Sequence, residues 1–167
     1  EIEDIRGKLG NHPIVLVGLM GAGKSSIGRR LAEKLSFPFV DADHEIEVAA
    51  GKSIAEIFAD HGEAYFREGE RRVISRLIEN GAQVLATGGG AFINDDTRER
   101  IAGHGVSVWL KADLPLLMKR VNKRSDRPLL LNDNPQAVMQ RLMDERYPIY
   151  GKADVIVESR DVQHTQM

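Results

Sequence analysis

Residues 14–25 read Ile14-Val-Leu-Val17-Gly18-Leu-Met-Gly21-Ala-Gly23-Lys24-Ser25. The first four residues are apolar and mostly β-branched, which predicts a short buried strand. After the lysine, Ile27, Leu31 and Leu35 follow at four-residue spacing, which predicts a helix from Lys24 to Leu35. Between strand and helix, two glycines five positions apart precede a lysine and a hydroxyl residue, the pattern of a phosphate-binding P-loop. Because the motif requires this order of strand, loop and helix, the segment predicts a nucleotide-binding α/β fold.

The loop suits phosphate because its glycines let backbone amides turn toward phosphate oxygens, while the following helix presents its positive end. We expect Lys24 to reach the β- and γ-phosphates and the Ser25 hydroxyl to bind Mg²⁺. The alternative is a glycine-rich turn that happens to precede a lysine. The flanking strand and helix favour the phosphate site.

Further strands and helices alternate along the chain. Strands are predicted at Phe37–Val40, Gln83–Thr87, Val106–Leu110 and Asp154–Glu158. Helices are predicted after the capping box Ser53-Ile-Ala-Glu56, over Tyr65–Ile78, and from Asn134-Pro135 to Arg146. Such alternation predicts one α/β domain over residues 1–167, with three layers and a central parallel sheet of about five strands. The polar segment 122–134 lacks periodicity, and we expect it to form a mobile lid.

The composition excludes several classes of protein. The chain has 167 residues, 42% hydrophobic and 29% charged, as expected for a globular domain. Lys and Arg number 23 against 25 Asp and Glu, so no overall positive charge favours nucleic acid. The absence of cysteine excludes disulfides and thiol catalysis and is compatible with the cytoplasm. The longest apolar-rich run, Ile14–Gly23, is too short to span a membrane, and we expect neither a membrane segment nor a signal peptide.

Two aspartates, Asp41 and Asp43, follow the second predicted strand, where folds of this kind bind ligands. One carboxylate could hold Mg²⁺ through water, and the other could accept a hydrogen bond or a proton from a substrate hydroxyl. The alternative is that Asp43 only caps a helix that starts at His44.

Three glycines, Gly88 to Gly90, follow a predicted strand and indicate close backbone approach, although a tight turn is an alternative.

Arginines form the other candidate group. From spacing alone, Arg67 is most simply an exposed residue of a helix that pairs with Glu63. By the same reasoning, Arg71 pairs with Glu70. Arg146 lies where the sequence indicates the end of a helix, and spacing assigns it no ligand. A basic cluster in and just before the expected lid could close over a triphosphate, although Lys123 and Arg124 could equally belong to a solvated face. Its members are Arg120, Lys123, Arg124 and Arg127.

Taken in order, these motifs resemble those of the shikimate kinases. They are the P-loop, Asp41-Ala-Asp43, Phe66-Arg67 with Glu70, Gly88 to Gly90, Arg127-Pro-Leu-Leu130 and Glu145-Arg-Tyr-Pro-Ile-Tyr150. The resemblance implies transfer of the γ-phosphoryl group of ATP to the 3-hydroxyl of shikimate, on the route to chorismate and the aromatic amino acids. It also implies a nucleoside-monophosphate-kinase-like domain, Mg²⁺ as cofactor and a monomer.

The resemblance also implies roles for individual residues. Asp43 would hold the shikimate hydroxyls, Arg67 and Arg146 would clamp the carboxylate, and the three glycines would line the pocket, which suits the planar guanidinium. Asp41 and Ser25 would be the residues near Mg²⁺. Lys24, Asp43 and Arg127 are the expected catalytic residues. The expected nucleotide-binding residues are Gly21, Ala22, Gly23, Lys24, Ser25, Ser26, Arg120, which would lie beside adenine, and Arg127.

Two other functions share parts of this pattern. A related small-molecule kinase, such as one acting on gluconate, would need the same P-loop, because that loop reads only phosphate. A nucleotide-binding module without catalysis is the third hypothesis, and the retention of Lys24, Ser25, Asp41 and Arg127 disfavours it.

Overall fold

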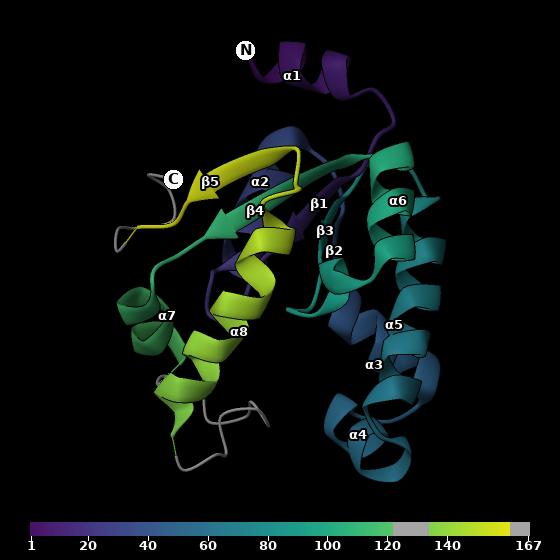
Figure 1. Cartoon of the computed structure of the whole chain (residues 1–167). Helices are drawn as coiled ribbons and strands as arrows, with labels where there is room; N and C mark the ends of the chain where they lie inside the picture. Colours follow the sequence, from purple (N-terminus) through teal and green to yellow (C-terminus); the bar gives the residue numbers. More distant parts are fainter. Residues whose placement is uncertain (122–133, 161–167) are drawn as a thin grey trace.

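The computed structural model describes residues 1–121 and 134–160, and within them five strands form one parallel sheet in the order β2-β3-β1-β4-β5 (Figure 1). The strands are β1 (Ile14–Val17), β2 (Phe39–Asp41), β3 (Val84–Ala86), β4 (Val106–Lys111) and β5 (Val155–Glu158). The helices are α1 (Ile2–Leu9), α2 (Lys24–Leu35), α3 (Ala42–Ala50), α4 (Ile54–His61), α5 (Glu63–Ile78), α6 (Asp95–His104), α7 (Leu114–Val121), α8 (Pro135–Tyr150) and the short 3₁₀ helix η1 (Ala91–Ile93). The predicted five-stranded parallel sheet is therefore confirmed.

The two faces of the sheet bury separate hydrophobic clusters. Successive side chains of a strand point to opposite faces, so β1 supplies both clusters. Ile14 and Leu16 pack with Ala32 and Leu35 of α2. Residues Val15 and Val17 belong to the larger cluster on the other face, which includes buried residues of α5, α6 and α8. Figure 1 shows α2 behind the sheet and α8 in front of it, which gives the three predicted layers.

The pairing of the strands brings three chain segments to one edge of the sheet. Leu16 of β1 lies opposite Ala86 of β3, and Ala86 lies opposite Asp41 of β2. The carboxyl ends of these three strands are thus nearly level. The P-loop, the start of α3 and the three glycines after β3 all leave the sheet at this edge, which is where parallel sheets bind ligands.

Some predicted boundaries are wrong. The second strand begins at Phe39, because the Phe37 amide donates to the Ala32 carbonyl and closes the turn after α2. Helix α8 does not end at Arg146 but continues through Pro148 to Tyr150. A proline so close to the helix end removes one backbone hydrogen bond, and the buried Tyr150 side chain compensates by packing into the core. Helices α1, α6 and α7 were not predicted, since they are short or weakly periodic, and α3 was considered only as an alternative that starts at His44.

The expected lid at 122–134, including Arg127, lies outside the described residues except for Asn134. The Asn134 side chain accepts a hydrogen bond from the Ala137 amide at 3.2 Å, as predicted for a residue that caps α8. Across 1–121 and 134–160, none of the helices combines the length and the apolar character needed to cross a bilayer.

Candidate active site

The P-loop connects β1 to α2 and takes backbone conformations that only glycine adopts readily. Gly21 and Gly23 have φ angles of 86° and 95°. A Cβ atom on Gly21 would also lie 2.9 Å from Cγ2 of Val121 in α7. Helix α2 begins at Lys24, so Ser25 lies in its first turn with its hydroxyl at the positive end of the helix dipole. The predicted strand, loop and helix are all present.

The Lys24 ammonium group lies over the P-loop itself. Its Nζ donates hydrogen bonds to the carbonyl oxygens of Gly18 at 2.5 Å and Leu19 at 3.0 Å. These bonds hold a positive charge at the start of the loop, on the side where β1 ends. A flexible side chain in this position can exchange carbonyl oxygens for phosphate oxygens without rearrangement of the backbone.

Arg120 joins the P-loop to two distant parts of the chain. Its Nη1 donates to the carbonyl oxygens of Gly21 at 3.2 Å and Ala22 at 3.0 Å, and to the Ser159 hydroxyl at 2.9 Å. Its Nη2 donates to the carbonyl oxygen of Arg160 at 3.1 Å. Arg120 therefore supports the loop from α7, and its expected contact with adenine stays a prediction.

Asp41 and Asp43 have different local roles. Asp41 ends β2 and caps α3, because its Oδ1 accepts a hydrogen bond from the Asp43 amide at 3.0 Å. The alternative that Asp43 caps a helix starting at His44 is wrong, since α3 begins at Ala42 and Asp43 lies in its first turn. The Asp43 carboxylate lies close to Gly88, at the edge of the sheet where the strands end.

The donor set at this edge fits a magnesium ion carried by a nucleotide. Ser25 lies in the first turn of α2, after β1 and the P-loop, and Asp41 ends β2 at the same edge of the sheet. In the described part of the chain, no three His, Cys, Asp or Glu side chains gather as a metal site. Such a sparse set suits Mg²⁺, which keeps several waters and takes phosphate oxygens as ligands.

The three glycines after β3, here called the glycine turn (Gly88–Gly90), each face a different candidate side chain. A Cβ on Gly88 would lie 2.8 Å from Oδ1 of Asp43. One on Gly89 would lie 3.2 Å from Nη1 of Arg146, and one on Gly90 would overlap the guanidinium of Arg67. The structure therefore brings together the six residues expected to bind the acceptor, and the alternative of a plain tight turn does not account for these contacts.

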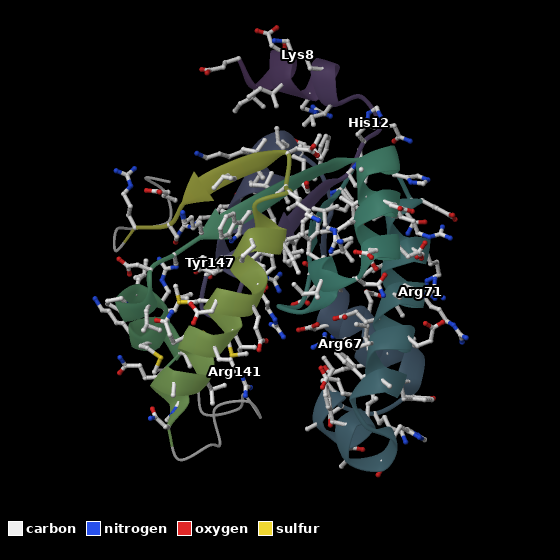
Figure 2. The ribbon with its side chains drawn as sticks, in the orientation of Figure 1. Lys8, His12, Arg67, Arg71, Arg141 and Tyr147 are labelled. Atoms are coloured by element: carbon white, nitrogen blue, oxygen red, sulfur yellow. The ribbon has the colours of Figure 1, made fainter. Side chains whose placement is uncertain are left out.

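Arg67 pairs with Glu63, as expected from spacing, and also with the buried Glu70, which was wrongly expected to pair with Arg71. Nη1 of Arg67 donates to Oε1 of Glu70 at 3.0 Å, and Nε lies 3.6 Å from Oε1 of Glu63. Arg71 pairs instead with Glu68 and Asp96. Figure 2 shows Arg67 on the side of α5 toward α8 and Arg71 on the outer side, so only Arg67 faces the site.

Glu70 is almost completely buried, with 3% of its surface exposed. Burial raises the pKa of Glu70, the Arg67 guanidinium lowers it, and Asp43 raises it further. Its Oε2 is buried and accepts no hydrogen bond from any described residue. From spacing, Glu70 was expected to pair with Arg71, although its spacing from Phe66, Val73 and Leu77 places it on the buried face of α5.

Comparisons with known proteins agree on one family. The family model described as shikimate kinase matches residues 20–167. The shikimate kinase of Mesorhizobium japonicum is 60% identical over 155 residues, which cover 93% of this chain and 76% of that protein. The solved structure of shikimate kinase from Acinetobacter baumannii in complex with shikimate has a TM-score of 0.91 and 38% identity, and the match covers 96% of this chain and 90% of that one.

A gluconokinase from Sinorhizobium meliloti is also similar in structure. Its TM-score is 0.62 at 18% identity, with 93% of this chain and 86% of that chain covered. At this identity the likeness shows a shared fold and nothing about the acceptor.

Proposed function

This chain belongs to the shikimate kinase family, and we propose from that membership how its residues carry out the reaction. The enzyme transfers the γ-phosphoryl group of ATP to the 3-hydroxyl of shikimate and releases ADP and shikimate 3-phosphate. We place this product on the route to chorismate and the aromatic amino acids. The enzyme would act as a monomer in the cytoplasm.

One observation carries the assignment of the acceptor site. The glycine turn approaches the Asp43 carboxylate and the guanidinium groups of Arg146 and Arg67 so closely that a Cβ on its first or last residue would displace one of these side chains. Two cationic side chains and one anionic side chain thus surround a stretch of backbone that carries no side chains. This arrangement suits the binding of a small hydroxylated acid. The guanidinium groups bind a carboxylate, and the aspartate binds hydroxyls.

In this proposal Arg67 and Arg146 form the carboxylate clamp and fix the orientation of the ring. Glu70 holds Arg67 from the protein side through the 3.0 Å hydrogen bond, which restricts the rotamers of the guanidinium. Asp43 holds the attacking hydroxyl and accepts its proton as the new bond to phosphorus forms. Positioning of this kind accounts for most of the catalysis in phosphoryl transfer.

The nucleotide would bind along the P-loop. Backbone amides from Gly21 to Ser26 would surround the phosphates, and Lys24 would neutralise charge on the transferred group. Ser25, and Asp41 through water, would hold Mg²⁺, which supplies positive charge at the β- and γ-phosphates. Arg127 would add a further positive charge to the same phosphates, a role that rests on the family resemblance.

The experiment that tests this proposal measures ADP release from Mg-ATP with shikimate, gluconate, a nucleoside monophosphate or no acceptor. We expect turnover that depends on shikimate and a background rate with the others. Turnover with gluconate alone would reassign the acceptor pocket and leave the P-loop assignment intact. ATP binding without turnover on any acceptor would favour a nucleotide-binding module.

A further inference from the structure

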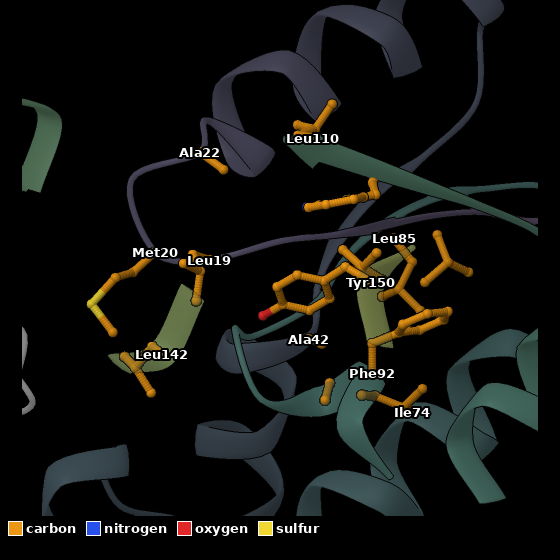
Figure 3. Packing of buried hydrophobic residues seen from close by; sticks show 14 of the residues in the cluster. Leu19, Met20, Ala22, Ala42, Ile74, Leu85, Phe92, Leu110, Leu142 and Tyr150 are labelled. Atoms are coloured by element: carbon orange, nitrogen blue, oxygen red, sulfur yellow. The ribbon is translucent and has the colours of Figure 1, made fainter. Parts of the chain in front are cut away.

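Tyr150 connects the end of α8 to the glycine turn. It is the last residue of α8, none of its surface is exposed, and its hydroxyl donates a hydrogen bond to the carbonyl oxygen of Gly89. Figure 3 shows its ring within the buried hydrophobic cluster, with the hydroxyl oxygen directed away from Phe92. The Tyr150 side chain thus passes through the hydrophobic core, and its hydroxyl group contacts the backbone of the acceptor site.

Arg146 lies one helical turn before Tyr150 and meets the same point. A Cβ on Gly89 would lie 3.2 Å from Nη1 of Arg146. Burial raises the pKa of Tyr150 to about 12, and the Arg146 guanidinium acts against this rise through its charge and a hydrogen bond. The hydroxyl of Tyr150, the carbonyl of Gly89 and the guanidinium of Arg146 therefore form one cluster.

The hydrogen bond also fixes the direction of a backbone amide. The Gly89 carbonyl and the Gly90 N–H belong to one planar peptide unit and point in opposite directions. Two neighbouring glycines give this unit unusual freedom to rotate. A donor that holds the Gly89 carbonyl therefore also restricts the direction of the Gly90 N–H.

We propose that Tyr150 is a positioning residue for the carboxylate of the acceptor. Its hydroxyl ties the Gly89–Gly90 peptide to the end of α8 that carries Arg146, so that the glycine turn and the clamp keep a fixed spacing. The inference rests on the proposed function, because it assumes that Arg67 and Arg146 bind a carboxylate. It assigns to Tyr150 an effect on acceptor binding and none on nucleotide binding.

Tyr147 provides a matched control on the same helix. Both tyrosines pack against Trp109, with ring centroids 4.9 Å away for Tyr147 and 5.6 Å away for Tyr150. The Tyr147 hydroxyl also donates to a backbone carbonyl, but that of Ala112, which follows β4. Replacing either tyrosine by phenylalanine deletes one hydroxyl and its hydrogen bond to a backbone carbonyl in the same aromatic cluster, and only the bond from Tyr150 reaches the glycine turn.

The test compares Tyr150→Phe with Tyr147→Phe in steady-state assays with shikimate and ATP varied separately. We expect Tyr150→Phe to raise KM for shikimate roughly 5- to 10-fold, the effect of one lost hydrogen bond, and to leave KM for ATP within twofold. Tyr147→Phe should leave both KM values within twofold. The shikimate-induced rise in Tm, which reports affinity independently of turnover, should shrink only in Tyr150→Phe.

The outcomes separate the inference from the proposed function. If wild-type enzyme turns over shikimate and the two variants have equal KM values for it, Tyr150 has only a structural role and the inference is wrong. Equal increases in KM for shikimate and ATP in Tyr150→Phe would also overturn it. If wild-type enzyme does not use shikimate at all, the proposed function fails first, and the inference fails with it.

Discussion

Glu70 is a charged residue at a position of α5 where the helix pattern predicts an apolar side chain. Phe66, Val73, Ile74 and Leu77 are its buried neighbours on that helix face. Burying a carboxylate is unfavourable unless it is paired, and here one oxygen accepts from Arg67 while the other accepts nothing within the described structure. The position makes sense only if the orientation of Arg67 matters more than the stability lost.

The raised pKa of Glu70 predicts a pH dependence of stability. The folded state binds this proton more tightly than the unfolded state, so stability falls as pH rises from the ordinary value of 4.5 through the folded pKa. We expect Glu70→Gln to remove this component. In urea titrations at pH 4.5 and pH 7, wild-type protein should lose more stability, or gain less, than the variant between the two pH values. An equal change in the free energy of unfolding between pH 4.5 and pH 7 in the two proteins would contradict a raised pKa of Glu70.

Arg146 and Arg141 give a paired prediction on α8. The Arg141 side chain is 64% exposed and lies 4.0 Å from Glu145, whereas Arg146 is half-buried beside the glycine turn. Loss of a charged hydrogen-bonding partner costs roughly 1.5–3 kcal/mol, so Arg146→Ala should raise KM for shikimate roughly 10- to 100-fold and KM for ATP much less. Arg141→Ala should change neither. Equal loss for both substrates in Arg146→Ala would contradict the carboxylate clamp.

At the scale of elements, how well the sequence predicts each one depends on how local its determinants are. The P-loop and α2 were predicted correctly because the motif and the helix spacing lie within one continuous segment. The end of α8 was wrong because Pro148 is an ordinary stop signal, whereas the buried Tyr150 that extends the helix is held by residues far away in the chain. The alternative start of α3 at His44 was wrong because either Asp41 or Asp43 could cap a helix, and only the position where β2 ends decides between them.

The close approach of the glycine turn to Asp43 predicts the effect of a substitution at Gly88. In Gly88→Ala the new Cβ would lie 2.8 Å from Oδ1 of Asp43 and 3.3 Å from Oε2 of Glu70, so the aspartate must move. A displacement near 1 Å at a reacting group costs on the order of a hundredfold, and we expect kcat/KM to fall by about that factor. The measurement is the steady-state rate with shikimate, at equal Tm of variant and wild type.

Gly69→Ala is the control for this substitution. Gly69 lies within α5, and apart from its chain neighbours and the backbone of that helix no atom lies within 4 Å of an added Cβ. Alanine in a helix interior is about 0.5–1 kcal/mol more stable than glycine, so this variant should be more stable and fully active. If Gly69→Ala lost activity as Gly88→Ala does, the effect would reflect loss of glycine flexibility and not the contact with Asp43.

At the scale of the whole molecule, one edge of the sheet collects side chains from segments far apart in the chain. The order β2-β3-β1 brings Asp43, the glycine turn and the P-loop together, and α5 and α8 add the two arginines. Strand alternation was enough to predict the parallel sheet and the edge at which ligands bind. The meeting of Arg67 with Gly90, and of Arg146 with Gly89, depends on how α5 and α8 pack, and no local pattern reports it.

This arrangement predicts that nucleotide stabilises the whole domain. A ligand at 100 times its Kd adds about 2.7 kcal/mol to a folded state that alone binds it, which corresponds to a rise in Tm of roughly 5–10 °C. We expect this rise with Mg-ATP, measured by thermal unfolding. Lys24→Ala should largely abolish the rise, whereas Lys34→Ala, an exposed residue at the other end of α2, should retain it. An undiminished rise in Lys24→Ala would remove that residue from the phosphate site.

Trp109 is the only tryptophan in the chain and is 4% exposed. Its ring contacts Tyr147 and Tyr150 and lies 3.5 Å from the position of a Cβ on Gly18, where the P-loop begins. The one strong fluorophore of the protein therefore touches the nucleotide loop on one side and, through Tyr150, the acceptor site on the other. Its emission can report the arrival of each substrate in a stopped-flow experiment without any attached label, which makes the order of binding directly measurable.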